Sequence, residues 1–133
     1  MPVVGSQGLS AEAVYERFRA LCLSLPETSE IFVENWGHPT FRVGPNDKMF
    51  ASCSPVDAER PSLGMKVEKA HQAALVGTDK RYSVAAYVGR HGWITVDASG
   101  QLDWDEIREL VVESYSLNAP KRLAKLVLDR GVV

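Results

Sequence analysis

The chain has 133 residues, of which 45% are hydrophobic and 24% are charged, and this composition is typical of one globular domain rather than a disordered chain. Its formal net charge of −2 at pH 7 excludes a protein that binds polyanions over most of its surface, because such proteins are usually basic. No apolar run reaches the roughly 18 residues that a membrane helix needs, and the first residues lack the pattern of a signal peptide. We therefore expect a cytoplasmic protein, with a loose lead-in over residues 1–8 and a single domain over residues 9–133.

A first helix is predicted to begin at Ser10. Serine is a favourable N-cap, and Glu12 follows in the first turn, where the helix dipole favours an anion. Pro26 predicts the end of this helix. Between these limits, apolar residues recur at helical spacing and form one stripe: Val14, Phe18, Leu21, Cys22 and Leu25.

A β-hairpin is predicted next, because the hydrophobic period shortens to about 2 between residues 31 and 67. Residues 40–43 and 48–53 alternate, and the turn sequence Gly44-Pro45-Asn46-Asp47 separates them. Simple alternation assigns Phe41, Val43, Met49, Ala51 and Cys53 to the core side, and Lys48, Phe50 and Ser52 to the opposite side.

The middle of the chain alternates between loops and short elements. Residues 54–61 are polar and bracketed by prolines, which predicts a projecting loop, and residues 63–67 predict a returning strand. A short helix is expected over residues 68–76, with Gly77 as its stop signal. Residues 78–92 fit either a short strand or a packed loop, whereas residues 93–97 predict a clear strand.

A long helix is predicted to begin at Asp103, with Glu106 at the third helical position in a variant of the capping box. Pro120 cannot lie inside a helix, so we expect a break near Asn118 and then a short helix that ends at Gly131. This order of elements predicts an α+β domain, in which helices cover one face of an antiparallel sheet.

Motifs of catalysis and metal binding are missing from the sequence. The three histidines, His38, His71 and His91, show no metal-binding spacing, and no phosphate loop, dinucleotide motif or nucleophile elbow occurs. Cys22 and Cys53 are expected to be buried fillers. We therefore predict no enzyme, no catalytic residue, no cofactor and no metal.

Basic residues form the more suggestive set. Arg42, Lys48 and Lys66 are expected on the sheet face opposite the core, where they would suit a phosphate backbone. The same pattern equally suits a solvated sheet face whose charges discourage edge-to-edge pairing. Trp36 and Trp93 stand beside glycines and suit either core anchors or, if exposed, stacking surfaces.

Short motifs in a defined order make the chain resemble the MmcQ/YjbR family over about residues 10–128. The motifs are Leu23-Ser24-Leu25-Pro26, Trp36-Gly37-His38-Pro39-Thr40-Phe41-Arg42-Val43, Lys48-Met49-Phe50-Ala51, Lys66-Val67, Tyr87-Val88-Gly89-Arg90-His91-Gly92-Trp93-Ile94, Leu102-Asp103-Trp104, Ser114-Tyr115 and Ala119-Pro120-Lys121-Arg122. This resemblance implies a frataxin-type fold, with a curved antiparallel sheet and the N- and C-terminal helices on one face. It also implies DNA binding by two projecting wings, which correspond to residues 44–48 and 54–61 of this sequence.

Two functions follow as expectations. The first is a non-enzymatic DNA-binding module whose phosphate contacts are Arg42, Lys48, Lys66, Arg81, Arg90 and Lys121. The alternative is a small-molecule or protein-binding domain with a pocket near Trp36, His38, Lys66 and Trp93. The iron binding of frataxins is not expected, because acidic and basic residues balance on the first helix. We expect a monomer or weak dimer that does not bind a membrane. The sequence predicts no particular protein partner.

Overall fold

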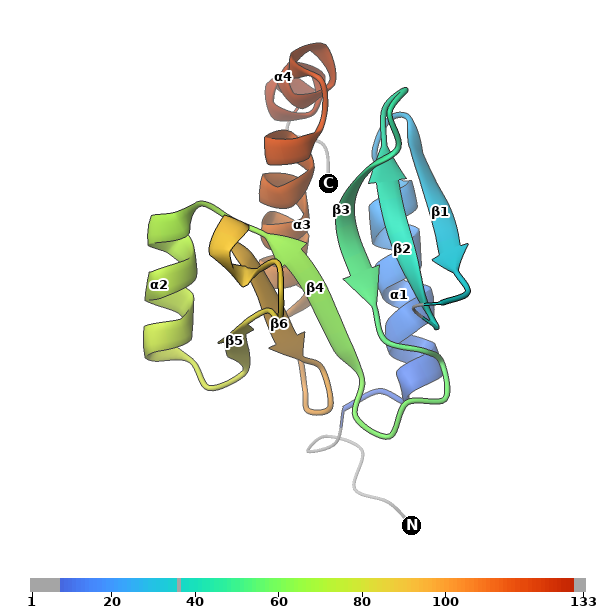
Figure 1. Ribbon diagram of the computed structural model, residues 1–133, viewed down its shortest axis with the longest axis vertical. Coiled ribbons are helices and arrows are strands. Elements are labelled where there is room, and N and C mark those ends of the chain that lie inside the picture. The colour runs from blue at the N-terminus through green and yellow to red at the C-terminus, as the bar shows by residue number, and fades with distance from the viewer. Residues whose placement is uncertain (1–7, 36, 131–133) are drawn as a thin grey trace.

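The computed structural model describes residues 8–35 and 37–130 of the chain. In this part, a six-stranded sheet runs in the order β1-β2-β3-β4-β6-β5, and every neighbouring pair is antiparallel. Helices α1 and α3 pack on one face of the sheet, α2 lies beside β5, and α4 follows α3 (Figure 1). The predicted α+β class with helices on one sheet face is confirmed.

The elements occur in the following order along the described chain: α1 (Ala11–Leu23), β1 (Thr28–Val33), β2 (His38–Val43), β3 (Lys48–Cys53), β4 (Ser62–Lys66), α2 (Lys69–Thr78), β5 (Tyr82–Val84), the 3₁₀ helix η1 (Gly89–His91), β6 (Trp93–Asp97), α3 (Trp104–Asn118) and α4 (Lys121–Arg130). Predictions for residues 1–7, Trp36 and Gly131 fall outside the described residues. None of the helices in this part is long and apolar enough to cross a membrane.

The first helix forms as its sequence predicts. The amide of Ala13 donates to Ser10 Oγ at 3.1 Å, which confirms the N-cap. From the apolar stripe, Phe18 is fully buried and packs edge-on against Phe41 of β2, with 5.8 Å between ring centroids. This contact places the core between α1 and the sheet.

A β-bulge overturns part of the predicted alternation in β3. Phe41 pairs with Ala51, but the next pair is Arg42 with Met49, so Phe50 is the extra residue. Phe50 is fully buried, and its ring meets Tyr115 of α3 edge-on at 5.6 Å. The assignment of Met49 to the core and Phe50 to the opposite side was therefore wrong, because one extra residue reverses which face each side chain occupies.

Strands β3 and β4 separate toward the end of the sheet where α4 lies (Figure 1). Their paired residues run only from Ala51–Met65 to Cys53–Leu63. Beyond them, Ser114 of α3 bridges the two strands: the amide of Lys66 donates to Ser114 Oγ at 2.9 Å, and Ser114 Oγ donates to the carbonyl of Phe50 at 2.6 Å. Ser114 is fully buried, and its hydroxyl satisfies one backbone group of each strand.

The second part of the chain departs from prediction at the end of α2. Helix α2 continues through Gly77 to Thr78, because Gly77 keeps a negative φ and does not adopt the left-handed conformation of a helix stop. The ambiguous residues 78–92 contain only a three-residue strand, β5, followed by turns and η1. The predicted N-cap Asp103 is confirmed, since its carboxylate accepts from the amides of Asp105 and Glu106.

Candidate functional site

The face of the sheet away from α1 and α3 carries two of the predicted cations. Arg42 alternates with the buried Phe41 and Val43, and Lys66 follows the buried Met65, so both belong to this open face. Register places them at the same end of the sheet, on strands two positions apart. The Arg42 guanidinium donates to Thr40 Oγ1 at 3.1 Å and to the carbonyl of Asp47 at 3.4 Å.

Lys48 and Lys121 lie near this end of the sheet but on other surfaces. Lys48 is exposed at the start of β3 and pairs with Val43, whose side chain faces the core, so Lys48 does not share the face of Arg42 as predicted. Lys121 is exposed at the start of α4. The hairpin turn reaches this helix, since a Cβ at Gly44 would lie 3.1 Å from Pro120 Cδ.

Several other arginines are held in ion pairs. Arg81 contacts Asp79 at 2.9 Å, and this hydrogen bond raises the pKa of Arg81 and lowers the pKa of Asp79. The Arg81 guanidinium also lies 3.9 Å from Glu106. Arg60 pairs in the same way with Asp97 at 2.8 Å. Because a neighbouring carboxylate already neutralises its charge, Arg81 is the weakest of the predicted phosphate contacts.

A cluster of basic side chains forms where β4, α2 and η1 meet, and we call Lys66, Lys69, Arg90 and His91 the basic cluster. Lys69 Nζ donates to the carbonyl of Arg90 at 2.8 Å, and Arg90 Nε donates to His91 Nε2 at 3.2 Å. No ion pair joins Lys66, Lys69 or Arg90 to a carboxylate within the described residues. The cluster therefore presents positive charge that no direct ion pair neutralises within the described residues.

Gly92 allows the parts of this cluster to approach each other. Its φ of +97° suits glycine, and a Cβ there would lie 2.2 Å from the carbonyl oxygen of Val67 and 3.7 Å from Lys66 Cγ. The amide of Val67 in turn donates to the carbonyl of Gly92 at 3.0 Å. The end of β4 and the turn after η1 are thus held backbone to backbone.

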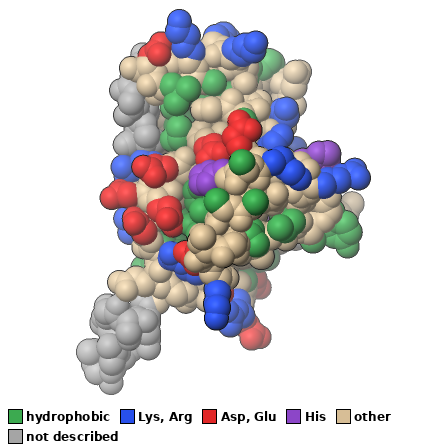
Figure 2. All heavy atoms as spheres, turned by 90° about the vertical axis from the view of Figure 1, so that its left-hand side faces the viewer, with side chains coloured by type: hydrophobic (Ala, Val, Ile, Leu, Met, Phe, Trp, Pro, Cys, Tyr) green, Lys and Arg blue, Asp and Glu red, His purple; other side chains and the backbone are tan. Residues whose placement is uncertain are grey.

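Charge is distributed unevenly over the molecule. Figure 2 shows a group of Lys, Arg and His side chains toward one edge of the surface that carries α2 and a group of Asp and Glu side chains toward the opposite edge, with further Asp, Glu and His side chains between them. A slightly acidic protein can therefore present a local positive surface. Sequence reasoning had singled out Lys66 and Arg90 but had missed Lys69. The available signal was the short spacing between Lys66, at the strand end, and Lys69, at the helix start.

Among the described residues of the pocket expected near the tryptophans, His38 does not lie with Lys66 and Trp93. Thr40, Ser52, Gly64 and Thr95 form one row across the sheet. His38 lies two residues before this row, whereas Lys66 and its partner Trp93 lie two residues beyond it, about 13 Å farther along the strands. Trp93 is only 7% exposed and offers no open stacking surface, and Trp36 lies outside the described residues. His38 instead lines a shallow hollow of about 120 Å³ on the open face.

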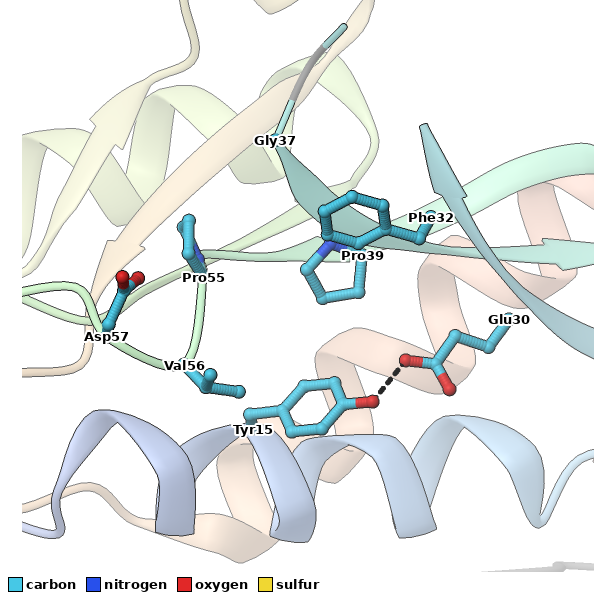
Figure 3. Close-up of a pocket in the computed structure, with 8 residues that line it drawn as sticks. All are labelled: Tyr15, Glu30, Phe32, Gly37, Pro39, Pro55, Val56 and Asp57. Atoms are coloured by element: carbon cyan, nitrogen blue, oxygen red, sulfur yellow. Dashed lines mark hydrogen bonds between the residues drawn. The ribbon is translucent and has the colours of Figure 1, made fainter. Parts of the chain in front are cut away.

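A larger pocket, of about 670 Å³, lies on the helix side of the sheet and was not predicted. It is formed by four segments that are remote in sequence, namely α1, β1, the start of β2 and the loop of residues 54–61 (Figure 3). The lining residues are Tyr15, Glu30, Phe32, Gly37, Pro39, Pro55, Val56 and Asp57. Because each segment contributes only one to three residues, no short sequence motif predicts this pocket.

One hydrogen-bond network supports the inner wall of this pocket. The Tyr15 hydroxyl and Arg19 Nε both donate to the Glu30 carboxylate, the latter at 2.6 Å. Burial and the neighbouring Glu30 carboxylate raise the pKa of Tyr15 to about 12. Tyr15 therefore keeps its proton at neutral pH and holds Glu30 in place.

The fold and sequence match known proteins as follows. The chain superimposes on a Deinococcus radiodurans protein with a DUF419 domain at a TM-score of 0.67 and 21% identity, over 90% of this chain and 81% of that one. It also superimposes on a Pseudomonas syringae protein at a TM-score of 0.65 and 23% identity, over 77% of this chain and 97% of that one. No curated protein matches the chain. The family model YjbR matches residues 23–117. The chain belongs to the YjbR family.

Proposed function

We propose that this YjbR-family chain is a non-enzymatic binding protein that contacts the phosphate backbone of DNA through the basic cluster and the adjoining end of the open sheet face. The observation that supports this most directly is that Lys66, Lys69 and Arg90 form no ion pair with a carboxylate in the described part of the chain. Phosphate contacts of this kind supply affinity and register rather than sequence readout.

Other residues extend the proposed interface. Arg42 lies on the same face and at the same end as Lys66. Lys48 at the tip of the β2–β3 hairpin and Lys121 of α4 add positive charge at this end of the molecule. The wing formed by residues 54–61 is less suitable, because its Arg60 already pairs with Asp97 and its Asp57 is exposed. The proposal therefore uses the first wing and not the second.

The alternative binding mode expected from the sequence receives less support. Its pocket near Trp36, His38, Lys66 and Trp93 would need His38 and Lys66 together, yet these residues occupy opposite ends of the sheet. DNA binding needs only cations on one accessible surface, which the basic cluster supplies.

The test is the binding of a fluorescein-labelled DNA duplex, measured by fluorescence anisotropy at several salt concentrations. If three phosphates are neutralised, the logarithm of the association constant should fall with the logarithm of salt with a slope of about −3. The double variant Lys66→Glu/Lys69→Glu should abolish binding at about 50 mM salt.

A matched control separates the cluster from net charge. Lys80→Glu/Lys125→Glu changes the net charge by the same amount at two exposed lysines outside the cluster, and it should retain most of the affinity. Equal loss in both double variants, or no binding by the unmodified protein, contradicts the proposal.

A further inference from the structure

We propose a second binding site, separate from the basic cluster: the pocket between α1, β1, β2 and the loop of residues 54–61 binds a small organic cation with an apolar body. Its volume of about 670 Å³ lies within the range of small-molecule sites. Nothing in the proposed DNA contact uses these residues, so the two sites stand or fall independently.

The apolar part of the proposed ligand is indicated by hydrophobic side chains that stay uncovered. Phe32 is 57% exposed and Val56 is 49% exposed, which is unusual for side chains of this size around one hollow. Phe32 is the cross-strand partner of Pro39, and Figure 3 shows this pair across the pocket from Tyr15 and Val56. A flat or branched hydrocarbon group placed there would cover both walls.

The charge of the proposed ligand is indicated by the carboxylates. The residues that line the pocket include Glu30 and Asp57 but no Lys or Arg. Glu30 already accepts hydrogen bonds from Tyr15 and from Arg19, which balances its charge. Asp57 is exposed and makes no hydrogen bond or ion pair within the described residues, so it adds an uncompensated negative charge beside the apolar walls.

The aromatic rings favour the same charge. An organic ammonium group is attracted to the faces of Tyr and Phe rings as well as to carboxylates. Tyr15 from α1 and Phe32 from β1 present two rings to the pocket, and a carboxylate-bearing ligand would instead meet Asp57 with like charge. The combination selects an ammonium ligand over a neutral or anionic one of equal size.

Three probes of similar shape test this selection: phenethylammonium, 2-phenylethanol and 3-phenylpropionate. Each is titrated into ¹⁵N-labelled protein and followed by amide chemical shifts. We expect shifts at Tyr15, Phe32 and Val56, with a dissociation constant of the order of 1 mM for the ammonium probe. Binding should weaken about fivefold for the alcohol and further for the carboxylate.

Variants locate the preference within the pocket. Asp57→Asn should bring the ammonium and alcohol probes closer in affinity, and Phe32→Ala should weaken all three probes. Asp129→Asn is a matched control at an exposed aspartate of α4 and should change nothing. Because Asp57 and Asp129 are both exposed, Asp57→Asn and Asp129→Asn are expected to fold.

Three results would overturn the proposal. One is equal binding of the three probes, and another is an ammonium preference that Asp57→Asn leaves unchanged. The third is an absence of shifts in the pocket up to about 10 mM ammonium probe, since even a fragment of this size binds a formed site more tightly than that. A failure here leaves the DNA proposal untouched, because the anisotropy test does not involve these residues.

Discussion

The two halves of the sheet are assembled by different rules. In the first half, β1, β2 and β3 follow one another in sequence and also in space, with α1 packed over them. In the second half, β4 pairs with β6, and the intervening chain forms α2 and the edge strand β5. The first half therefore rests on hairpin contacts close in sequence, whereas the second rests on contacts between segments that are far apart.

Each candidate site lies in a different half of the sheet. The organic-cation pocket lies at the edge of the first half, between a helix and a hairpin. The basic cluster lies in the second half, where the end of β4 meets the turn before β6. Helix α3 joins the halves, because Ser114 bonds to the backbone of both β3 and β4.

The largest expected effect is at this junction. Ser114→Ala leaves the carbonyl of Phe50 and the amide of Lys66 without their partner, and we expect a loss of about 2–4 kcal/mol in the free energy of unfolding, measured in urea. Ser116→Ala is the matched control: its hydroxyl is buried without a hydrogen-bond partner, so its removal should be neutral or slightly stabilising. Equal effects of the two substitutions would mean that the halves do not depend on the Ser114 bridge.

A smaller effect should stay within the first half. The Tyr115 hydroxyl donates to the carbonyl of Pro26 at 2.8 Å, which ties α3 to the connection between α1 and β1. Tyr115→Phe removes this bond and should cost about 1 kcal/mol. Native-state hydrogen exchange should show faster exchange in β1 than in β6; faster exchange confined to β6 would contradict this division of the sheet.

The smallest expected effect is a loss of folding stability at acid pH, which we examine by comparing one ion pair from each half. The hydrogen bond with Arg122 lowers the pKa of Glu27, and that with Arg81 lowers the pKa of Asp79. A carboxyl whose folded-state pKa is depressed contributes stability above its unfolded pKa, and this contribution is lost as pH falls through the folded pKa. Stability should therefore decline below about pH 4.5.

The two pairs differ in sequence separation. Glu27 and Arg122 are 95 positions apart, whereas Asp79 and Arg81 are two apart and can stay close in the unfolded chain. Arg122→Gln should flatten the acid decline more than Arg81→Gln does, measured by urea unfolding from pH 3 to 6. The reverse order would show that the local pair makes the larger contribution.

Local features of the fold were predictable because their signals are local. The caps at Ser10 and Asp103 and the strand of residues 93–97 all formed as predicted, since each depends on neighbouring residues. The bulge at Phe50 was not predictable from alternation, because its burial is decided by Tyr115 of α3. Gly77 was misread for a related reason: glycine permits a helix stop but does not impose one.

The candidate sites were predicted less well than the fold. Lys66 and Arg90 were named as cations, but they form one cluster through two contacts, that of Lys69 with the Arg90 carbonyl, 21 positions apart, and that of Val67 with Gly92. Arg81 was also predicted as a phosphate contact because it is a cation, yet Asp79 holds it in an ion pair. The sequence shows which residues carry a charge, whereas the packing of the fold decides which residue each of them contacts.

Sequence reasoning alone predicted the α+β class, the positions of the helix caps and hairpin, and, through motifs such as Ser114-Tyr115, the YjbR family. Those features follow from hydrophobic period and capping chemistry, which act over a few residues. Packing of the whole chain was needed to show that Ser114 bridges β3 and β4, that Lys66, Lys69 and Arg90 form no ion pair with a carboxylate among the described residues, and that Tyr15, Phe32 and Asp57 share a pocket. Each of these contacts joins segments that are distant in sequence and come together only when the whole core is packed. No short stretch of the chain can therefore predict them.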